Sequence, residues 1–156
     1  MNVFKIFTIE KSVLFTMIVF ASFYCAPAHA VSCREAAGTP DMEDEDWDHI
    51  SQTHCDGITP TTSSTVAQDI CVKTGKSQFA PSFCDQAAMY SLADKAIGSA
   101  SCTVTKSSGG KVYLKYKNDN SYTGFDRDQN CNDVGQVGII VNTTRKRIET
   151  MYPMKP

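Results

Sequence analysis

The pattern of apolar and polar positions divides the chain into a helical first half and a strand-forming second half. Up to Gly98, apolar residues recur three or four positions apart, which places them on one face of an amphipathic helix. Beyond Gly98, apolar and polar residues alternate over short stretches, as they do in half-buried strands. An α+β fold with the helices first and the sheet second is therefore predicted.

About three N-terminal helices are predicted. The first has an apolar stripe of Trp47, Ile50 and His54. The last has the broadest apolar face, so we expect it to be the central helix and to pack across one face of the sheet. The predicted ranges are 41–55, 65–72 and 81–97, after an irregular lead-in at 31–40.

The second half is predicted to be an antiparallel meander of four to five strands. Short apolar-alternating runs are separated by turn-forming residues, such as Gly109-Gly110 and the polar run at 118–121. Because neighbouring runs are joined by short turns, consecutive strands should pair. The predicted strands are 102–106, 111–117, 122–125, 136–141 and 147–152.

The first thirty residues are predicted to be a cleavable secretory signal peptide. Lys5 and Lys11 precede an apolar run at 13–24, and the small-residue pattern Ala28-His29-Ala30 follows it. The apolar run is shorter than the roughly 20 residues of a membrane-spanning helix. Residues 31–156 are then one exported globular domain, located in a periplasm or secreted.

Cysteines support export. Cys25 lies in the leader, and the bulky Phe23-Tyr24 before it disfavour lipid attachment there. The six remaining cysteines are an even number, which in an exported domain predicts three disulfides. The closest two are too far apart for a zinc knuckle, whose paired ligands lie about two to four residues apart. The sequence leaves the pairing open, since six cysteines allow fifteen connectivities. The set taken as a guess is Cys71–Cys84 and Cys102–Cys131, which leaves Cys33–Cys55.

Charge is unevenly spread, with a net −8 over residues 31–94 and +5 over 95–156. A bipolar surface is therefore predicted, and such a field can steer a charged partner. The acidic start of the first helix is the candidate docking face for another protein, such as a basic one, and a solvated surface is the alternative. The candidate contact residues are Asp44, Asp46, Trp47 and Asp48.

The basic turn Arg145-Lys146-Arg147 is a weak signal. It lacks the neighbouring aromatic residues on which single-stranded nucleic acid stacks, so no nucleic-acid partner is predicted. Gly75-Lys76-Ser77 resembles the end of a phosphate-binding loop, but Ile70 stands where that motif needs glycine. A chance match is the better interpretation.

Two other groups of residues were candidates for ligands. The loop 126–135 is rich in oxygen ligands, but Cys131 and Val137 replace a glycine and an acid of a calcium-binding loop. A polar hairpin loop is favoured, and calcium binding stays open. His49 and His54 lie about 140° apart on a helix, so they should not share a metal, and His54 is expected at the edge of the core. No cofactor is predicted.

The sequence favours a binding role over catalysis, because no catalytic motif is present. The leading hypothesis is an exported protein-binding module, such as a periplasmic inhibitor or an immunity-type protein. The alternatives are a small secreted hydrolase or toxin with dispersed catalytic residues (His49, His54 and Arg145), and a structural component of an envelope assembly. A concave pocket with converging polar groups would favour the enzyme, and a flat patch around Trp47 the binding module.

Overall fold

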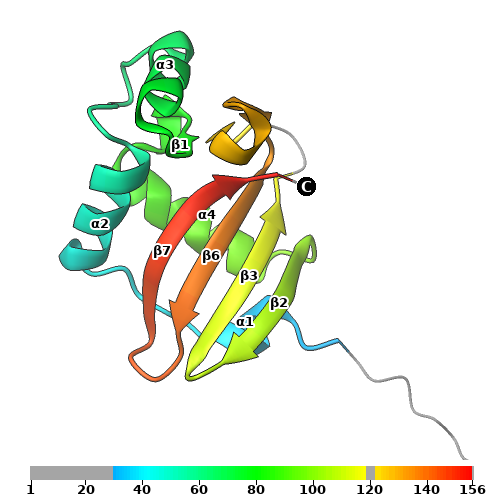
Figure 1. The fold of residues 1–156 in the computed structure, drawn as a ribbon. Coiled ribbons are helices and arrows are strands. Elements are labelled where there is room, and N and C mark those ends of the chain that lie inside the picture. The colour runs from blue at the N-terminus through cyan, green and yellow to red at the C-terminus, as the bar shows by residue number, and fades with distance from the viewer. Residues whose placement is uncertain (1–29, 119–121, 156) are drawn as a thin grey trace, which may run out of the picture.

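A computed structural model describes residues 30–118 and 122–155 of the chain, and it confirms the α+β prediction (Figure 1). The predicted signal peptide and Cys25 lie outside the described residues, apart from Ala30. Among the helices that are described, none has both the length and the apolar character needed to cross a membrane. The described chain forms helices, two antiparallel sheets and three disulfides.

The larger sheet contains four of the predicted strands in the order β2-β3-β6-β7. Its alternating pattern sorts the side chains: Val112, Leu114 and Tyr116 of β3 are buried, whereas the residues between them are half-buried or exposed. One face of this sheet therefore forms the core. The strands are β2 (Cys102–Ser108), β3 (Lys111–Lys117), β6 (Gln136–Asn142) and β7 (Arg147–Met154).

Helix α4 (Gln86–Gly98) packs behind this sheet and is the central helix, as predicted (Figure 1). It begins later than expected, because Asp85 accepts a hydrogen bond from the Ala88 amide and so caps α4. The preceding residues form a separate 3₁₀ turn, η1 (Pro81–Phe83). The lead-in, predicted to be irregular, contains the short helix α1 (Cys33–Ala37), which Ser32 caps.

Helices α2 (Asp44–His54) and α3 (Ser64–Thr74) lie beyond the β7 edge of the sheet (Figure 1). α2 packs beside β7 and begins three residues later than predicted, with Glu43 and Asp46 forming a reciprocal cap. α3 begins one residue earlier than predicted, because Ser63 caps it by accepting a hydrogen bond from the Val66 amide. The helices themselves were predicted correctly, and their first residues depend on which side chain caps them.

The predicted third strand leaves the meander, which is a correction. It pairs instead in a small sheet of order β1-β4-β5, made of β1 (Gln78–Phe79), β4 (Gly124–Asp126) and β5 (Asn132–Val134). Gly124 allows this close pairing, because a Cβ there would lie 2.2 Å from the Gln78 carbonyl oxygen. The 3₁₀ turn η2 (Arg127–Gln129) joins β4 to β5, in line with the predicted polar hairpin loop.

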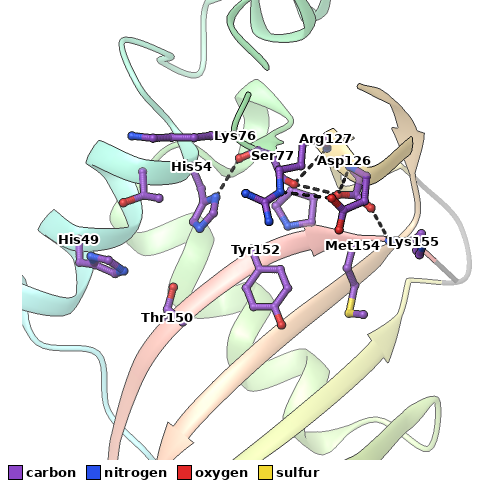
Figure 2. A pocket seen from close by; sticks show the side chains of 13 residues that line it. His49, His54, Lys76, Ser77, Asp126, Arg127, Thr150, Tyr152, Met154 and Lys155 are labelled. Atoms are coloured by element: carbon purple, nitrogen blue, oxygen red, sulfur yellow. Dashed lines mark hydrogen bonds and ion pairs between the residues drawn. The ribbon is translucent and has the colours of Figure 1, made fainter. Parts of the chain in front are cut away.

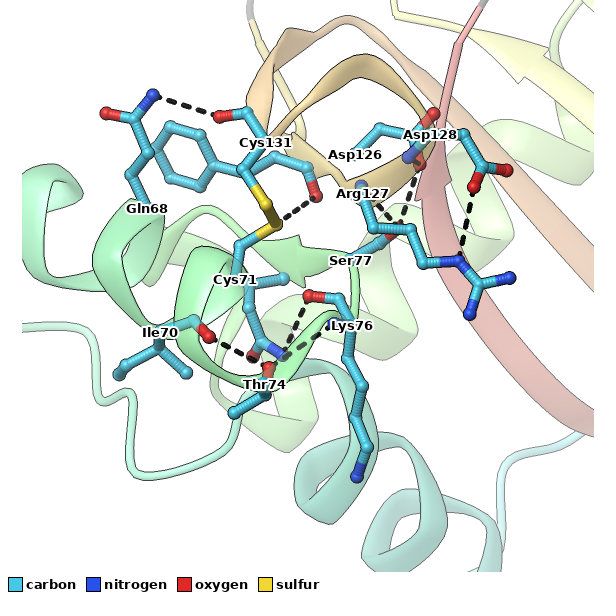
Figure 3. The surroundings of a disulfide bond; sticks show 12 residues. Gln68, Ile70, Cys71, Thr74, Lys76, Ser77, Asp126, Arg127, Asp128 and Cys131 are labelled. Atoms are coloured by element: carbon cyan, nitrogen blue, oxygen red, sulfur yellow. Dashed lines mark hydrogen bonds and ion pairs between the residues drawn. A yellow bond between two sulfur atoms is a disulfide. The ribbon is translucent and has the colours of Figure 1, made fainter.

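All six cysteines that the structure describes form disulfides, but each of the three predicted pairings is wrong. The observed pairs are Cys33–Cys102, Cys55–Cys84 and Cys71–Cys131. They join α1 to β2, the end of α2 to the segment before α4, and α3 to the loop between β4 and β5 (Figure 3). Pairing follows the packing of helices onto distant strands, so proximity in the sequence does not predict it.

Candidate functional site

A cleft of about 640 Å³ lies where the end of α2 meets β7 and the loop after β4 (Figure 2). Its volume is within the range of small-molecule sites, roughly 300–1,000 Å³. We call it the histidine cleft. Its lining residues are His49, Thr53, His54, Lys76, Ser77, Asp126, Arg127, Asp128, Thr150, Tyr152, Pro153, Met154 and Lys155.

His54, the last residue of α2, has a defined orientation in this cleft. Its Nδ1 lies 2.8 Å from the Ser77 carbonyl oxygen, which can only accept a hydrogen bond, so Nδ1 carries the proton. The other ring nitrogen, Nε2, then has a free lone pair. The ring contacts Phe79 edge-on and lies 6.1 Å from the Tyr152 ring centroid. His54 is thus at the edge of the core, as predicted, and it also lines the cleft.

The surroundings of His54 disfavour its charged form. Burial of the ring is the largest effect and lowers the pKa of His54, although the hydrogen bond to Ser77 opposes it. The nearby positive charges of Lys76 and Arg127 lower this pKa further. Figure 2 shows Arg127 and His54 extending toward one another. His54 is therefore mainly neutral at pH 7, and positive groups surround it.

A buried amide and a disulfide hold the end of α2 in place. The Gln78 amide is fully buried, donates to the Thr53 carbonyl at 3.2 Å and accepts from the Asp56 amide at 3.2 Å. Cys55, which directly follows His54, is bonded to Cys84. Together these contacts position His54 from both sides of the helix end.

The acids of the cleft are already engaged. Asp126 is buried and accepts hydrogen bonds from the Ser77 hydroxyl (2.9 Å) and from the Lys155 amide (2.9 Å). Because the Ser77 hydroxyl donates to Asp126, Ser77 and His54 do not form a nucleophile–base pair. Asp128 lies at the exposed rim, 3.3 Å from Arg127 Nε. Neither carboxylate reaches the lysines.

The lysines of the cleft lack such partners. Within the part of the chain that the structure describes, Lys76 and Lys155 form no ion pair, and both side chains are exposed. With Arg127 they place positive charge around a neutral imidazole and the Tyr152 ring. The arrangement suits an anionic group bound beside an apolar or aromatic one.

At the start of α2, part of the predicted docking face is engaged in contacts within the protein. Asp46 is buried and receives two hydrogen bonds from the Arg147 guanidinium, at 2.8 and 2.9 Å. The same guanidinium contacts Glu43 and Glu45, and hydrogen bonding to Asp46 raises the pKa of Arg147. Asp46 is thus a structural residue in an ion-pair network, not a free contact residue.

The other predicted contact residues lie differently. Asp44 and Asp48 are exposed, and Asp44 accepts a hydrogen bond from the Gln86 amide at 3.1 Å. Trp47 is half-buried and packs against the core. The acidic half of the chain thus meets a basic residue of the second half, Arg147, so the predicted charge separation is partly neutralised at this contact.

The structure brings two of the three dispersed candidates, His49 and His54, together in the histidine cleft, whereas Arg145 is not part of its lining. His49 lines the histidine cleft beside His54, and it also borders a smaller hollow of about 260 Å³ with Arg145. Both histidines line the cleft despite their separation around α2. Lys76, Arg127, Tyr152 and Lys155 were not predicted as site residues, since they come from three separate segments and Lys76 stood only in a motif match that was rejected.

The described residues contain no group of three or more histidine, cysteine or carboxylate side chains placed to hold a metal ion. Comparisons of the chain with protein-family models, with curated proteins and with solved structures find no match.

Proposed function

We propose that the protein is a small exported binding module, periplasmic or secreted, which recognises an anionic group of its partner in the histidine cleft. One observation carries this proposal. The cleft's acids are engaged in internal contacts, whereas Lys76 and Lys155 at its edge have no ion-pair partner among the described residues. Unpaired cations around a concave site are the usual means of binding carboxylate or phosphate.

Export is supported by the three disulfides, because such bonds persist mainly in oxidising compartments. The role of a protein inhibitor or immunity-type protein is compatible with this site if the partner presents an acidic side chain to it. Docking of a basic protein at the start of α2 is a separate proposal, which rests on the exposure of Asp44 and Asp48.

A small hydrolase is the second candidate, and two observations favour it: the concave cleft lined by polar groups, which was the criterion for an enzyme, and the orientation of His54. A neutral imidazole with Nδ1 fixed by a backbone carbonyl keeps Nε2 ready to remove a proton from a water or hydroxyl nucleophile. Lys76 and Arg127 could then stabilise the negative charge that develops on the substrate. Turnover of an anionic substrate, lost in His54→Gln and kept in His49→Gln, would favour catalysis over binding alone.

The binding site can be tested by titrating the oxidised protein with inorganic phosphate while following the histidine ring signals by NMR. We expect the His54 signals to shift and its pKa to rise, because a bound anion stabilises the imidazolium. Arg127→Ala should weaken this response, while Arg34→Ala, on the α1 side of the molecule, should leave it unchanged. An unchanged His54 signal at saturating phosphate, or equal responses in both variants, would overturn the proposal.

A further inference from the structure

The outer face of the four-stranded sheet continues from the histidine cleft. In β3 the residues that alternate with the buried ones are Lys111, Tyr113, Lys115 and Lys117, so they project from the face opposite α4. Figure 1 shows α4 behind the sheet and no described helix across its front face. Tyr152 of β7 lies on this face and also lines the cleft, so the two surfaces are continuous.

Two tyrosine rings lie on this face. Gly138 of β6 leaves room for the Tyr152 ring, because a Cβ at that position would lie 2.6 Å from Tyr152 Cζ. Tyr113 is close enough to raise the pKa of Tyr152, together with burial, which is the larger effect. Lys106 Nζ lies 5.3 Å from the centroid of the Tyr113 ring. The face thus combines aromatic rings with cations.

Its charge is strongly positive. The four strands contain one acid, Glu149, and four lysines; their fifth basic residue, Arg147, is already ion-paired at the start of α2. The Glu149 carboxylate already contacts Lys111 and accepts a hydrogen bond from the Asn142 amide. Among the residues that are described, Lys106, Lys115 and Lys117 have no acidic partner. Charge complementarity therefore requires an anionic occupant.

We propose that this face and the histidine cleft together bind single-stranded nucleic acid, an inference that rests on the proposed anion-binding function of the cleft. The phosphates contact the lysines of β2 and β3 and one of them enters the cleft, while bases stack on Tyr113 and Tyr152. The aromatic rings favour a single strand over a duplex, because only unpaired bases can offer a free ring face. They also favour it over an acidic polypeptide, which the lysines alone would attract.

The oxidised protein can be tested with a short fluorescein-labelled oligothymidylate, using fluorescence anisotropy at low salt. We expect binding that weakens as salt rises, since lysine–phosphate contacts release counterions. Tyr152→Leu and Tyr113→Leu should each weaken binding about tenfold or more, the effect of losing one stacking contact. Tyr90→Leu is the matched control, because Tyr90 is an exposed tyrosine on α4, behind the sheet.

Heparin and polyglutamate are the comparison ligands, since both are polyanions without bases. Their binding should fall in a Lys115→Ala/Lys117→Ala variant but stay unchanged in Tyr152→Leu. The inference is overturned if the oligothymidylate does not bind, or if the tyrosine variants bind it as the wild type does, which would indicate a polyanion surface only. Phosphate binding at His54 without oligothymidylate binding would reject this inference alone, and an unresponsive His54 would reject the cleft as well.

Discussion

The two ends of α2 show opposite uses of charge. At its start, Glu43, Glu45 and Asp46 gather around one cation, Arg147, and Asp46 is buried against it. At its end, His54 faces a cleft whose lysines have no ion-pair partner among the described residues. A charge held by an internal partner mainly contributes to stability, whereas a charge held without one is available to a ligand.

The ends also differ in what fixes them. The start of α2 is held by hydrogen bonds and ion pairs across to β7, which weaken in salt at the exposed members. The end of α2 is held by the Cys55–Cys84 bond. The loop between β4 and β5, which lines the same cleft, is tied to α3 by the Cys71–Cys131 bond. Covalent links suit a site whose charges repel one another, since they keep those charges close without an internal counter-ion.

The largest expected effect comes from removing the covalent link of the cleft. Asn130 and Cys131 both have positive φ, and the Cys71–Cys131 bond holds this loop against α3 (Figure 3). A Cys71→Ser/Cys131→Ser variant should lose about 2–5 kcal/mol of unfolding free energy in urea titrations. It should also bind phosphate less well, because Arg127 is no longer fixed beside His54.

The matched control removes the Cys33–Cys102 bond, which lies on the α1 side of the sheet, away from the cleft. Its loss should lower stability by a similar amount but leave phosphate binding at His54 intact. If both double variants bind phosphate equally well, the histidine cleft does not depend on the Cys71–Cys131 link, and the contrast between the two ends fails.

The fold class and the central helix were predictable, because each depends on a local period that the sequence displays directly. The position of the third predicted strand, β4, was not predictable. Its partner β1 has only two residues and therefore shows no periodicity, yet their pairing removes β4 from the meander. The disulfide partners were not predictable either. Each bond joins elements that tertiary packing brings together, and the closest pair is still 29 residues apart.

Only part of the site was predictable, because most of its residues are brought together by tertiary packing. His49 and His54 attract attention as the only histidines of residues 31–156, but Lys76, Arg127 and Tyr152 are ordinary residues in the sequence. Their importance comes from the meeting of α2, the segment before β1, the β4–β5 loop and β7 at one place. Asp46 shows the converse: its sequence context predicted a partner-binding residue, but its contact with Arg147 depends on the fold.

The next largest effect should come from breaking the network at the start of α2. Asp46→Ala removes two hydrogen bonds of the Arg147 guanidinium, which keeps its contacts with Glu43 and Glu45, and leaves the Glu43 amide without its side-chain acceptor. We expect a cost of about 1–3 kcal/mol. Thermal melts should show this loss, whereas Asp48→Ala, an exposed neighbour, should change little. Phosphate binding should be normal in both, and a loss of binding in Asp46→Ala would mean that the two ends of α2 are coupled.

Removing a cation from the cleft should have the opposite pattern: phosphate binding should weaken while stability stays nearly unchanged. Lys76→Ala should change the unfolding free energy by less than about 0.5 kcal/mol, because Lys76 is exposed and has no ion pair within the described chain. Its phosphate affinity should fall about tenfold, as expected for one lost charge-assisted contact. Lys73→Ala, an exposed lysine on α3 outside the cleft lining, is the control. Equal affinities for the two variants would remove Lys76 from the site.

The smallest effect should be the pH dependence that His54 contributes. Its pKa is lowered in the folded protein, so below pH 6.5 the unfolded chain binds more protons at this residue than the folded one. Stability should therefore decline as pH falls below 6.5 toward the folded-state pKa, and it should be restored as pH rises. The comparison of Tm at pH 7 and pH 5 should show a smaller drop in His54→Gln than in the wild type.

His49→Gln should keep most of the decrease in Tm between pH 7 and pH 5, because the buried ring of His54 is still present. Saturating phosphate should also reduce the drop in the wild type, since an anion beside the imidazole favours its charged form and raises the folded-state pKa. In His54→Gln, phosphate should no longer change the pH dependence. If phosphate flattens the profile equally in both proteins, the anion binds elsewhere, and the end of α2 would then resemble its start, with charges that serve the fold alone.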